Sequence, residues 1–156
     1  MVTEINGDLL QSTAQVIAHQ VNCMGVAGAG LAKQIMDKYP ENLHFYLNHC
    51  SRFSADYLLG TALFVECTDG KIIANLFGQK RFGRDNKMYT DYGALDTALG
   101  FLRKFMDEKG LTSVAFPYKL GCGLGGGDWK VVKNVIKKRF GDLDCYIYKL
   151  AKHGEK

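Results

Sequence analysis

The chain has 156 residues, of which 47% are hydrophobic and 23% are charged, and its formal net charge is +4. This length is typical of one domain with its own hydrophobic core, and no apolar run is long enough to cross a membrane. The five cysteines are scattered and never form a C-x-x-C pair, which argues against a disulfide framework or a zinc site and suits a reducing cytoplasm. We therefore expect a single domain over residues 1–156, monomeric and cytoplasmic, whose mild positive charge is compatible with an anionic ligand such as a nucleotide.

The hydrophobic pattern predicts alternating strands and helices. Strand-like apolar runs and helical periodicity follow one another in chain order: strands 2–6 and 15–22, helices 30–39 and 41–52, strands 61–67 and 71–77, helix 92–109, strand 112–117, helix 128–140 and strand 143–149. Asp69-Gly70 is a strong hairpin signal between the third and fourth strands. This order predicts an α/β fold in which helices cover both faces of a mixed sheet.

The last two long helices have well-defined apolar faces. In 92–109 the inner face is formed by Leu95, Ala98, Leu99, Leu102, Phe105 and Met106. In 128–140 it is formed by Val131, Val132, Val135, Ile136 and Phe140. Such a stripe is typical of a helix that packs on a sheet.

Two glycine-rich loops each join a predicted strand to a predicted helix: "GVAGAG" at 25–30 and "GCGLGGG" at 121–127. Ligands of open α/β sheets bind beyond the carboxyl ends of the strands, so we expect both loops to face that crevice. The loop at 25–30 matches neither the dinucleotide fingerprint, which would need a glycine at Lys33, nor the phosphate-binding P-loop, which would need a lysine at Leu31. Free amides at a helix start still favour a phosphate, and two such loops could hold a diphosphate from both sides. The alternative is that both are only tight strand–helix turns.

Four segments carry a family resemblance. They are "INGDLL" at 5–10, "VIAHQVNCMGVAGAGLAKQI" at 16–35, "NLFGQ" at 75–79 and "GCGLGGGDW" at 121–129. In this order they resemble the macrodomains, which bind ADP-ribose, and the resemblance covers essentially the whole chain. It is greatest to the branch that includes the terminal ADP-ribose protein glycohydrolase, the ADP-ribose-1''-phosphate phosphatase and an antitoxin that removes ADP-ribose from DNA. The resemblance implies a three-layer α/β/α sandwich around a mixed sheet of about six strands.

The resemblance also implies a set of ADP-ribose-binding residues. Asp8 occupies the position whose carboxylate accepts a hydrogen bond from the adenine amino group, and Asn22 lies beside the distal ribose. The further implied ADP-ribose-binding residues, most of them in the two glycine-rich loops, are Leu9, Gly25, Val26, Ala27, Gly28, Ala29, Gly30, Leu31, Leu120, Gly121, Cys122, Gly123, Leu124, Gly125 and Gly126. Two alternatives stay open: Asp8 could be a turn or helix-cap aspartate, and Asn22 could serve local backbone groups.

Two residues are candidates for catalysis. In the most similar glycohydrolases a lysine after the fourth strand and an aspartate directly after "GCGL" carry the reaction at the distal ribose. Lys80 falls near the first position, where it would have to lose its proton, helped by burial or by Arg81. The second position is Gly125, and Asp128 follows three residues later. Asp128 is therefore a candidate general acid–base or, alternatively, a helix cap; Lys80 is alternatively an exposed loop lysine.

Three other features have weaker interpretations. "GRDNKMYTDY" at 83–92 could fold over the distal ribose and set substrate choice, or its Thr90 or Asp91 could simply cap the next helix. A helix start could lower the pKa of the Cys122 thiol, but no base stands beside it in sequence. His19, within an apolar strand, reads as a core histidine.

We therefore expect an enzyme that binds ADP-ribose and hydrolyses bonds at C1'' of the distal ribose. Its substrates would be mono-ADP-ribosyl groups on glutamate or aspartate side chains of proteins, or ADP-ribose-1''-phosphate. A non-catalytic ADP-ribose-binding module is the alternative, and removal of ADP-ribose from DNA is the third hypothesis. No cofactor, metal or membrane is expected, and nucleic acid enters only as an ADP-ribosylated substrate.

Overall fold

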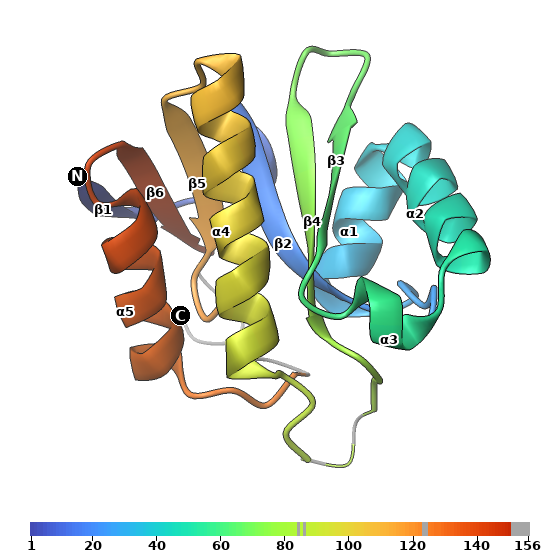
Figure 1. The fold of residues 1–156 in the computed structure, drawn as a ribbon. Helices are drawn as coiled ribbons and strands as arrows, with labels where there is room; N and C mark the ends of the chain where they lie inside the picture. The colour runs from blue at the N-terminus through green and yellow to red at the C-terminus, as the bar shows by residue number, and fades with distance from the viewer. Residues whose placement is uncertain (84, 86, 123–124, 151–156) are drawn as a thin grey trace.

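The computed structural model describes residues 1–83, 85, 87–122 and 125–150. Its elements in chain order are β1 (Val2–Asn6), the 3-10 helix η1 (Leu9–Gln11), β2 (Val16–Asn22), α1 (Gly30–Lys38), α2 (Pro40–Arg52), α3 (Ala55–Leu58), β3 (Ala62–Glu66), β4 (Ile72–Gln79), α4 (Tyr92–Lys109), β5 (Ser113–Pro117), α5 (Trp129–Phe140) and β6 (Asp144–Lys149). All the predicted strands and long helices are confirmed, and η1 and α3 are additional (Figure 1).

The six strands form one mixed sheet in the order β1-β6-β5-β2-β4-β3. Five of them are parallel, and β3 runs antiparallel to β4 across the predicted hairpin. The hairpin turn contains Gly70 at φ +88°, a left-handed conformation that glycine adopts readily. Because β2, β4 and β5 are parallel, their carboxyl ends meet at one edge of the sheet.

Helices cover both faces of the sheet, which makes the three-layer α/β/α architecture. On one face, α4 and α5 pack on alternate residues of the central strands, including Val16 and Ala18; Figure 1 shows both helices in front of the sheet. On the other face, α1 and α2 pack on the intervening residues, including Ile17 and Val21. The central strand is therefore apolar on both sides, as expected of a buried parallel strand. Val131, predicted on the inner face of α5, is 38% exposed and does not belong to the core.

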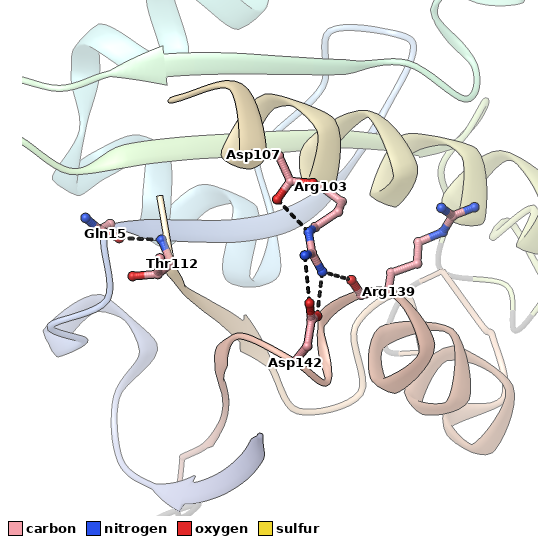
Figure 2. A network of polar contacts seen from close by, with 6 residues as sticks. All are labelled: Gln15, Arg103, Asp107, Thr112, Arg139 and Asp142. Carbon is pink, nitrogen blue, oxygen red and sulfur yellow. Dashed lines mark hydrogen bonds and ion pairs between the residues drawn. The ribbon is translucent and has the colours of Figure 1, made fainter. Parts of the chain in front are cut away.

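A polar network holds the sheet edge opposite the carboxyl ends of β2, β4 and β5. The Arg103 guanidinium of α4 donates to both carboxylate oxygens of Asp142 at 2.6 and 2.9 Å, to Asp107 at 2.9 Å and to the Arg139 carbonyl at 2.7 Å (Figure 2). The hydrogen bonds from Arg103 lower the pKa of Asp142 to about 2. Nearby, the Gln15 side chain accepts from the Thr112 amide at 2.9 Å, which joins the starts of β2 and β5. Side-chain hydrogen bonds therefore hold this edge together, while loops form the opposite edge, at the carboxyl ends of β2, β4 and β5.

No helix in the described part of the chain is long and apolar enough to cross a membrane. All five cysteines are free thiols.

Candidate active site

A cavity of about 400 Å³ opens at the carboxyl ends of β2, β4 and β5. Both glycine-rich loops contribute to its wall, as predicted. Its described lining residues are His19, Gln20, Val21, Asn22, Val26, Ala27, Gly28, Ala29, Gly30, Leu31, Ala32, Gln79, Phe82, Gly83, Pro117, Tyr118, Lys119, Leu120, Gly121 and Gly125. None of them is a carboxylate and Lys119 is a cation, so the described wall suits an anionic ligand.

Asn22 shapes the loop at 25–30. Its Nδ2 donates to the Val26 carbonyl at 2.7 Å, and its Oδ1 accepts from the Met24 amide at 3.0 Å. The buried Tyr46 hydroxyl of α2 donates to the Asn22 carbonyl at 2.8 Å. Asn22 is 8% exposed and lines the cavity, so its side chain both bonds to the local backbone and forms part of the cavity wall.

The same loop presents unhindered backbone to the cavity. Ala29 is the N-cap of α1 and makes no side-chain capping bond, so the first amides of this helix are left for another partner. A Cβ at Gly28 would meet no atom within 4 Å, because this residue faces open space in the cavity wall. Gly30 has φ +61°, a conformation that favours glycine. An anion can therefore approach the start of α1 closely.

The loop at 121–127 has no room for a side chain at Gly125. A Cβ there would lie 2.7 Å from the Gly121 carbonyl oxygen and would also overlap the Thr90 hydroxyl. The Gly125 carbonyl accepts from the amides of Tyr89 and Thr90 at 2.7 and 2.8 Å. The aspartate expected of the glycohydrolase pattern is thus absent from the sequence and also excluded by the packing.

Residues 89–91, the described end of the segment at 83–92, are hydrogen-bonded to this loop and to β4. In addition to the bonds to Gly125, the Asp91 amide donates to the Gly78 carbonyl at 2.8 Å, and Gln79 and Thr90 form an isolated bridge. Asp91 caps α4 by accepting from the Ala94 amide at 3.0 Å. Phe82 and Gly83 reach the cavity wall, while Arg84 and Asn86 lie outside the described residues.

A pair of glutamines in the cavity wall connects these pieces, and neither glutamine was predicted as a site residue from the sequence. Gln20 Nε2 donates to Gln79 Oε1 at 2.6 Å and to the Thr90 hydroxyl at 2.8 Å, and Thr90 donates to the Gly121 carbonyl at 2.6 Å. The sequence signal that could have revealed the pair is Gln20, a polar residue within the apolar run of β2. The network ties β2, β4, the 83–92 segment and the loop at 121–127 together.

Lys80 follows β4 directly but does not line the cavity. Its ammonium group forms an ion pair with Asp56 of α3, and its side chain is 40% exposed. The hydrogen bond from Lys80 lowers the pKa of Asp56. An ammonium in this pair is a charged donor, and it becomes a nucleophile only after it leaves Asp56 and loses its proton.

Asp128 and Asp8 both act as helix caps. Asp128 is exposed and accepts from the Lys130 amide at 3.0 Å at the start of α5. Asp8 accepts from the Leu10 amide at 2.9 Å at the start of η1. Neither lines the cavity, and nor does Leu9, but Leu9 belongs to the same apolar cluster as Leu31 of the cavity wall. Asp8 therefore precedes directly in the chain a residue, Leu9, that shares an apolar cluster with Leu31 of the cavity wall.

Several other predicted site residues fall outside the wall. Cys122 packs against the core under α4 and α5, and burial raises the pKa of its thiol to about 11, so it is not a thiolate at neutral pH. The expectation of a lowered thiol pKa was wrong because burial outweighs any effect of the helix start. Gly25 and Gly126 do not line the cavity, and Gly123 and Leu124 lie outside the described residues.

His19 belongs to the cavity wall, and its side chain is buried in a polar cluster. Its Nε2 is 2.7 Å from Asn75 Oδ1, and Asn75 Nδ2 donates to Asn42 Oδ1 at 2.8 Å. Burial lowers the pKa of His19 to about 4, so it is neutral at pH 7. This agrees with the prediction of a core histidine. Among the described residues, no group of three or more His, Cys, Asp or Glu side chains could hold a metal ion.

Comparisons with known proteins agree with this geometry. A family model described as "Macro domain" matches residues 18–136. The chain is 34% identical over 155 residues to a DNA ADP-ribosyl glycohydrolase of Mycobacterium tuberculosis, a match that covers 95% of this chain but 42% of that protein. It is 28% identical over 178 residues to an ADP-ribose 1''-phosphate phosphatase of Debaryomyces hansenii, covering 95% of this chain and 98% of the relative.

Solved structures give the same result. The macrodomain of Mycobacterium tuberculosis DarG matches with a TM-score of 0.84 and 30% identity, over 97% of this chain and 99% of that chain. A macrodomain protein from Streptomyces coelicolor matches with a TM-score of 0.79 and 26% identity, over 96% and 99% of the two chains.

Proposed function

Since the chain belongs to the Macro domain family, we propose that it binds ADP-ribose in the cavity at the carboxyl ends of β2, β4 and β5 and hydrolyses bonds at C1'' of the distal ribose. One observation carries the binding step: the uncapped start of α1 meets the open space in front of Gly28 inside the cavity. A diphosphate that lies there accepts hydrogen bonds from helix amides and meets no side chain.

The ends of the ligand follow from this placement. The adenine lies toward Leu31 and Leu9, where the Asp8 carboxylate accepts a hydrogen bond from the exocyclic amine. Asp8 uses Oδ1 for the Leu10 amide, which leaves the second oxygen for the ligand. The distal ribose lies at the other end, toward Asn22, Gln79 and Phe82.

Lys80 is the proposed catalytic amine. Gln79, directly before it in the chain, and Phe82, two residues after it, both line the cavity. For the reaction the Lys80 side chain leaves Asp56, and its neutral amine attacks C1'' while the bond from C1'' to the acceptor breaks and the acceptor departs with the bonding electrons. One water then displaces the amine from C1'', which releases ADP-ribose and restores Lys80. The described cavity wall supplies no carboxylate for acid–base work, so the amine and the oriented ligand carry the reaction.

A binding module without turnover is the second candidate. It is favoured by two observations: Gly125 excludes a side chain, and the Lys80 ammonium is held in an ion pair. In this case ADP-ribose binds in the same cavity and no bond is broken.

The group that is bonded to C1'' and released by hydrolysis belongs to one of three classes: a protein carboxylate, a phosphate or a nucleotide in DNA. The relatives described above include a DNA ADP-ribosyl glycohydrolase and an ADP-ribose 1''-phosphate phosphatase, which support the second and third classes.

The test is ADP-ribose calorimetry together with a time course of ADP-ribose release from all three substrate classes. Wild type is compared with Lys80→Ala and with Lys104→Ala, an exposed lysine of α4 that serves as the matched control. We expect wild type and Lys104→Ala to turn over at the same rate and Lys80→Ala to bind ADP-ribose without turnover. Full turnover by Lys80→Ala removes the lysine from the mechanism, and binding without turnover by wild type leaves the binding module.

A further inference from the structure

Lys80 stands on a backbone that hydrogen bonds hold on both sides. The Lys80 carbonyl accepts from the Cys23 amide at 3.1 Å, directly after β2. One residue further on, the Arg81 carbonyl accepts from Nε2 of the Gln79 side chain at 2.7 Å, so the Gln79 amide group bridges the main chain across Lys80. The Lys80 side chain extends away from this bridge to the exposed Asp56. An ion pair this exposed holds a side chain weakly, so the amine can turn while its backbone stays in place.

The bridging amide group is oriented by a chain of hydrogen bonds that has a carbonyl at each end. The Arg81 carbonyl can only accept, so Gln79 presents Nε2 to it and Oε1 to Gln20. At the other end the Gly121 carbonyl accepts from the Thr90 hydroxyl, whose oxygen is then left to accept from Gln20. Gln20 Nε2 therefore donates in both directions, at 2.6 Å to Gln79 and at 2.8 Å to Thr90. The two terminal carbonyls thus fix the direction of every hydrogen bond between them.

Three glycines leave room for the Gln20 amide group. A Cβ at Gly78 would lie 2.3 Å from Gln20 Oε1, and a Cβ at Gly121 would lie 3.0 Å from the same atom. A Cβ at Gly125 would lie 3.0 Å from Gln20 Nε2. A side chain at these positions would displace the amide group from its hydrogen bonds. Packing and hydrogen bonds therefore hold Gln20 together, and this accounts for the glycine in "NLFGQ".

We propose that Gln79, oriented by Gln20, is a positioning residue that fixes the backbone from which the Lys80 amine reaches C1''. This inference rests on the proposed function, because it takes Lys80 as the catalytic amine. The chain of hydrogen bonds ends at Gly121 in the cavity wall, so it joins the backbone at Lys80 to a loop that lines the ligand space. A reacting group displaced by about 1 Å can lose about 100-fold in rate, so this backbone matters although neither glutamine forms or breaks a bond.

The test compares Gln20→Met and Gln79→Met with wild type and with Gln15→Met. Methionine keeps the length of the glutamine side chain and removes its amide hydrogen bonds. Gln15 is the matched control, because it is a glutamine directly before β2 that accepts from the Thr112 amide at the opposite edge of the sheet (Figure 2). The substrate is the one of the three classes that wild type hydrolyses fastest.

A positioning role predicts a loss of rate rather than of affinity. We expect kcat to fall at least about tenfold in Gln20→Met and Gln79→Met while the Kd for ADP-ribose, measured by calorimetry, stays within about threefold. Gln15→Met should match wild type in both quantities. The double variant Gln20→Met/Gln79→Met should lose no more rate than the more affected single variant, because both substitutions break the same chain.

Thr90 offers a conservative pair on the same chain. Thr90→Val removes the hydroxyl at nearly constant volume, so it should lower kcat as Gln20→Met does. Thr90→Ser keeps the hydroxyl between Gln20 and the Gly121 carbonyl, so it should restore most of the wild-type rate.

Amide hydrogen exchange reports on the backbone independently of turnover. The Cys23 amide donates to the Lys80 carbonyl, so its exchange rate measures how often this contact opens. We expect this amide to exchange at least about fivefold faster in Gln20→Met and Gln79→Met, and at the wild-type rate in Gln15→Met.

Four outcomes overturn the proposal in a protein that hydrolyses its substrate: full kcat in Gln20→Met and Gln79→Met, a fall in kcat with unchanged Cys23 exchange, a double variant whose loss is the product of the two single losses, or full turnover by Lys80→Ala. Absence of turnover by wild type is a different result. It refutes the proposed hydrolysis and this role together, and faster Cys23 exchange in the variants would then assign Gln79 to the fold alone.

Discussion

Gly28 allows the binding site to be perturbed without perturbing the fold. A Cβ at this position would meet no atom within 4 Å, and the φ angle of Gly28 lies outside the left-handed range. The folded protein therefore accommodates Gly28→Ala without strain. Removing a glycine where the backbone is unstrained stabilises a protein by about 0.4–1 kcal/mol, because the unfolded chain has fewer conformations to lose. The new methyl group, however, stands in the cavity where the diphosphate is proposed to lie.

The expected loss of affinity follows from that contact. A methyl group that prevents one backbone amide from reaching a phosphate removes a hydrogen bond to a charged group, worth about 1.5–3 kcal/mol. This corresponds to an ADP-ribose affinity about 10- to 150-fold weaker. The affinity is measured by calorimetry, and the free energy of unfolding by urea denaturation.

Gly93→Ala is the matched control. It lies near the start of α4, where a Cβ would be 3.5 Å from Asp91 Oδ1, an ordinary contact, and it does not line the cavity. We expect this variant to be at least as stable as wild type and to bind ADP-ribose equally well. Unchanged affinity of Gly28→Ala would refute the placement of the diphosphate at the start of α1. A large loss of stability in the same variant would refute the description of Gly28 as facing open space.

The remaining predictions concern three other positions. Gly125→Asp should not create glutamate-linked hydrolase activity and should destabilise the fold by about 1–3 kcal/mol, because its side chain overlaps the Gly121 carbonyl; a stable and more active variant in urea denaturation and turnover assays would contradict this. The buried His19 is neutral in the fold, and its pKa is lowered from 6.5 to about 4, so the unfolded chain binds a proton first as the pH falls. The contribution of neutral His19 to the free energy of unfolding is full above pH 6.5, and about 3 kcal/mol of it is lost between pH 6.5 and 4. His19→Gln should remove this part of the pH dependence of the free energy of unfolding. Identical pH profiles for the variant and wild type would exclude the effect. Asp128→Ala should lower the free energy of unfolding by about 1 kcal/mol through the lost cap and keep its rate of turnover; a large fall in rate in the folded variant would return Asp128 to the reaction.

The sequence predicted the elements well because their signals are local. Each predicted strand and long helix is present within one or two residues at its ends, including the hairpin at Asp69-Gly70 and the helix face of Leu95 to Met106. The two elements that were not predicted, η1 and α3, span three and four residues, too short for a periodic pattern to be visible.

The candidate site was predicted only in part. Strand–loop–helix order placed both glycine loops at the carboxyl ends of the strands, and the cavity is there. Asp8 and Asp128 remained ambiguous, because the same short carboxylate serves equally as a cap or as a ligand contact, and sequence spacing fits both uses. The structure shows both as caps, which for Asp8 still leaves one oxygen for a ligand.

The sequence by itself determined the α/β order and the two loops that form the cavity, since these depend on periodicity and on glycine positions along the chain. Its four motifs carried the resemblance to the family. Only the tertiary structure decided which side chains face the cavity. Lys80 meets Asp56 across 24 residues of chain, and the Thr90 hydroxyl fills the space beside Gly125 from 35 positions away. Such contacts depend on how separate elements pack against each other, and packing distances between elements leave no pattern in a single sequence.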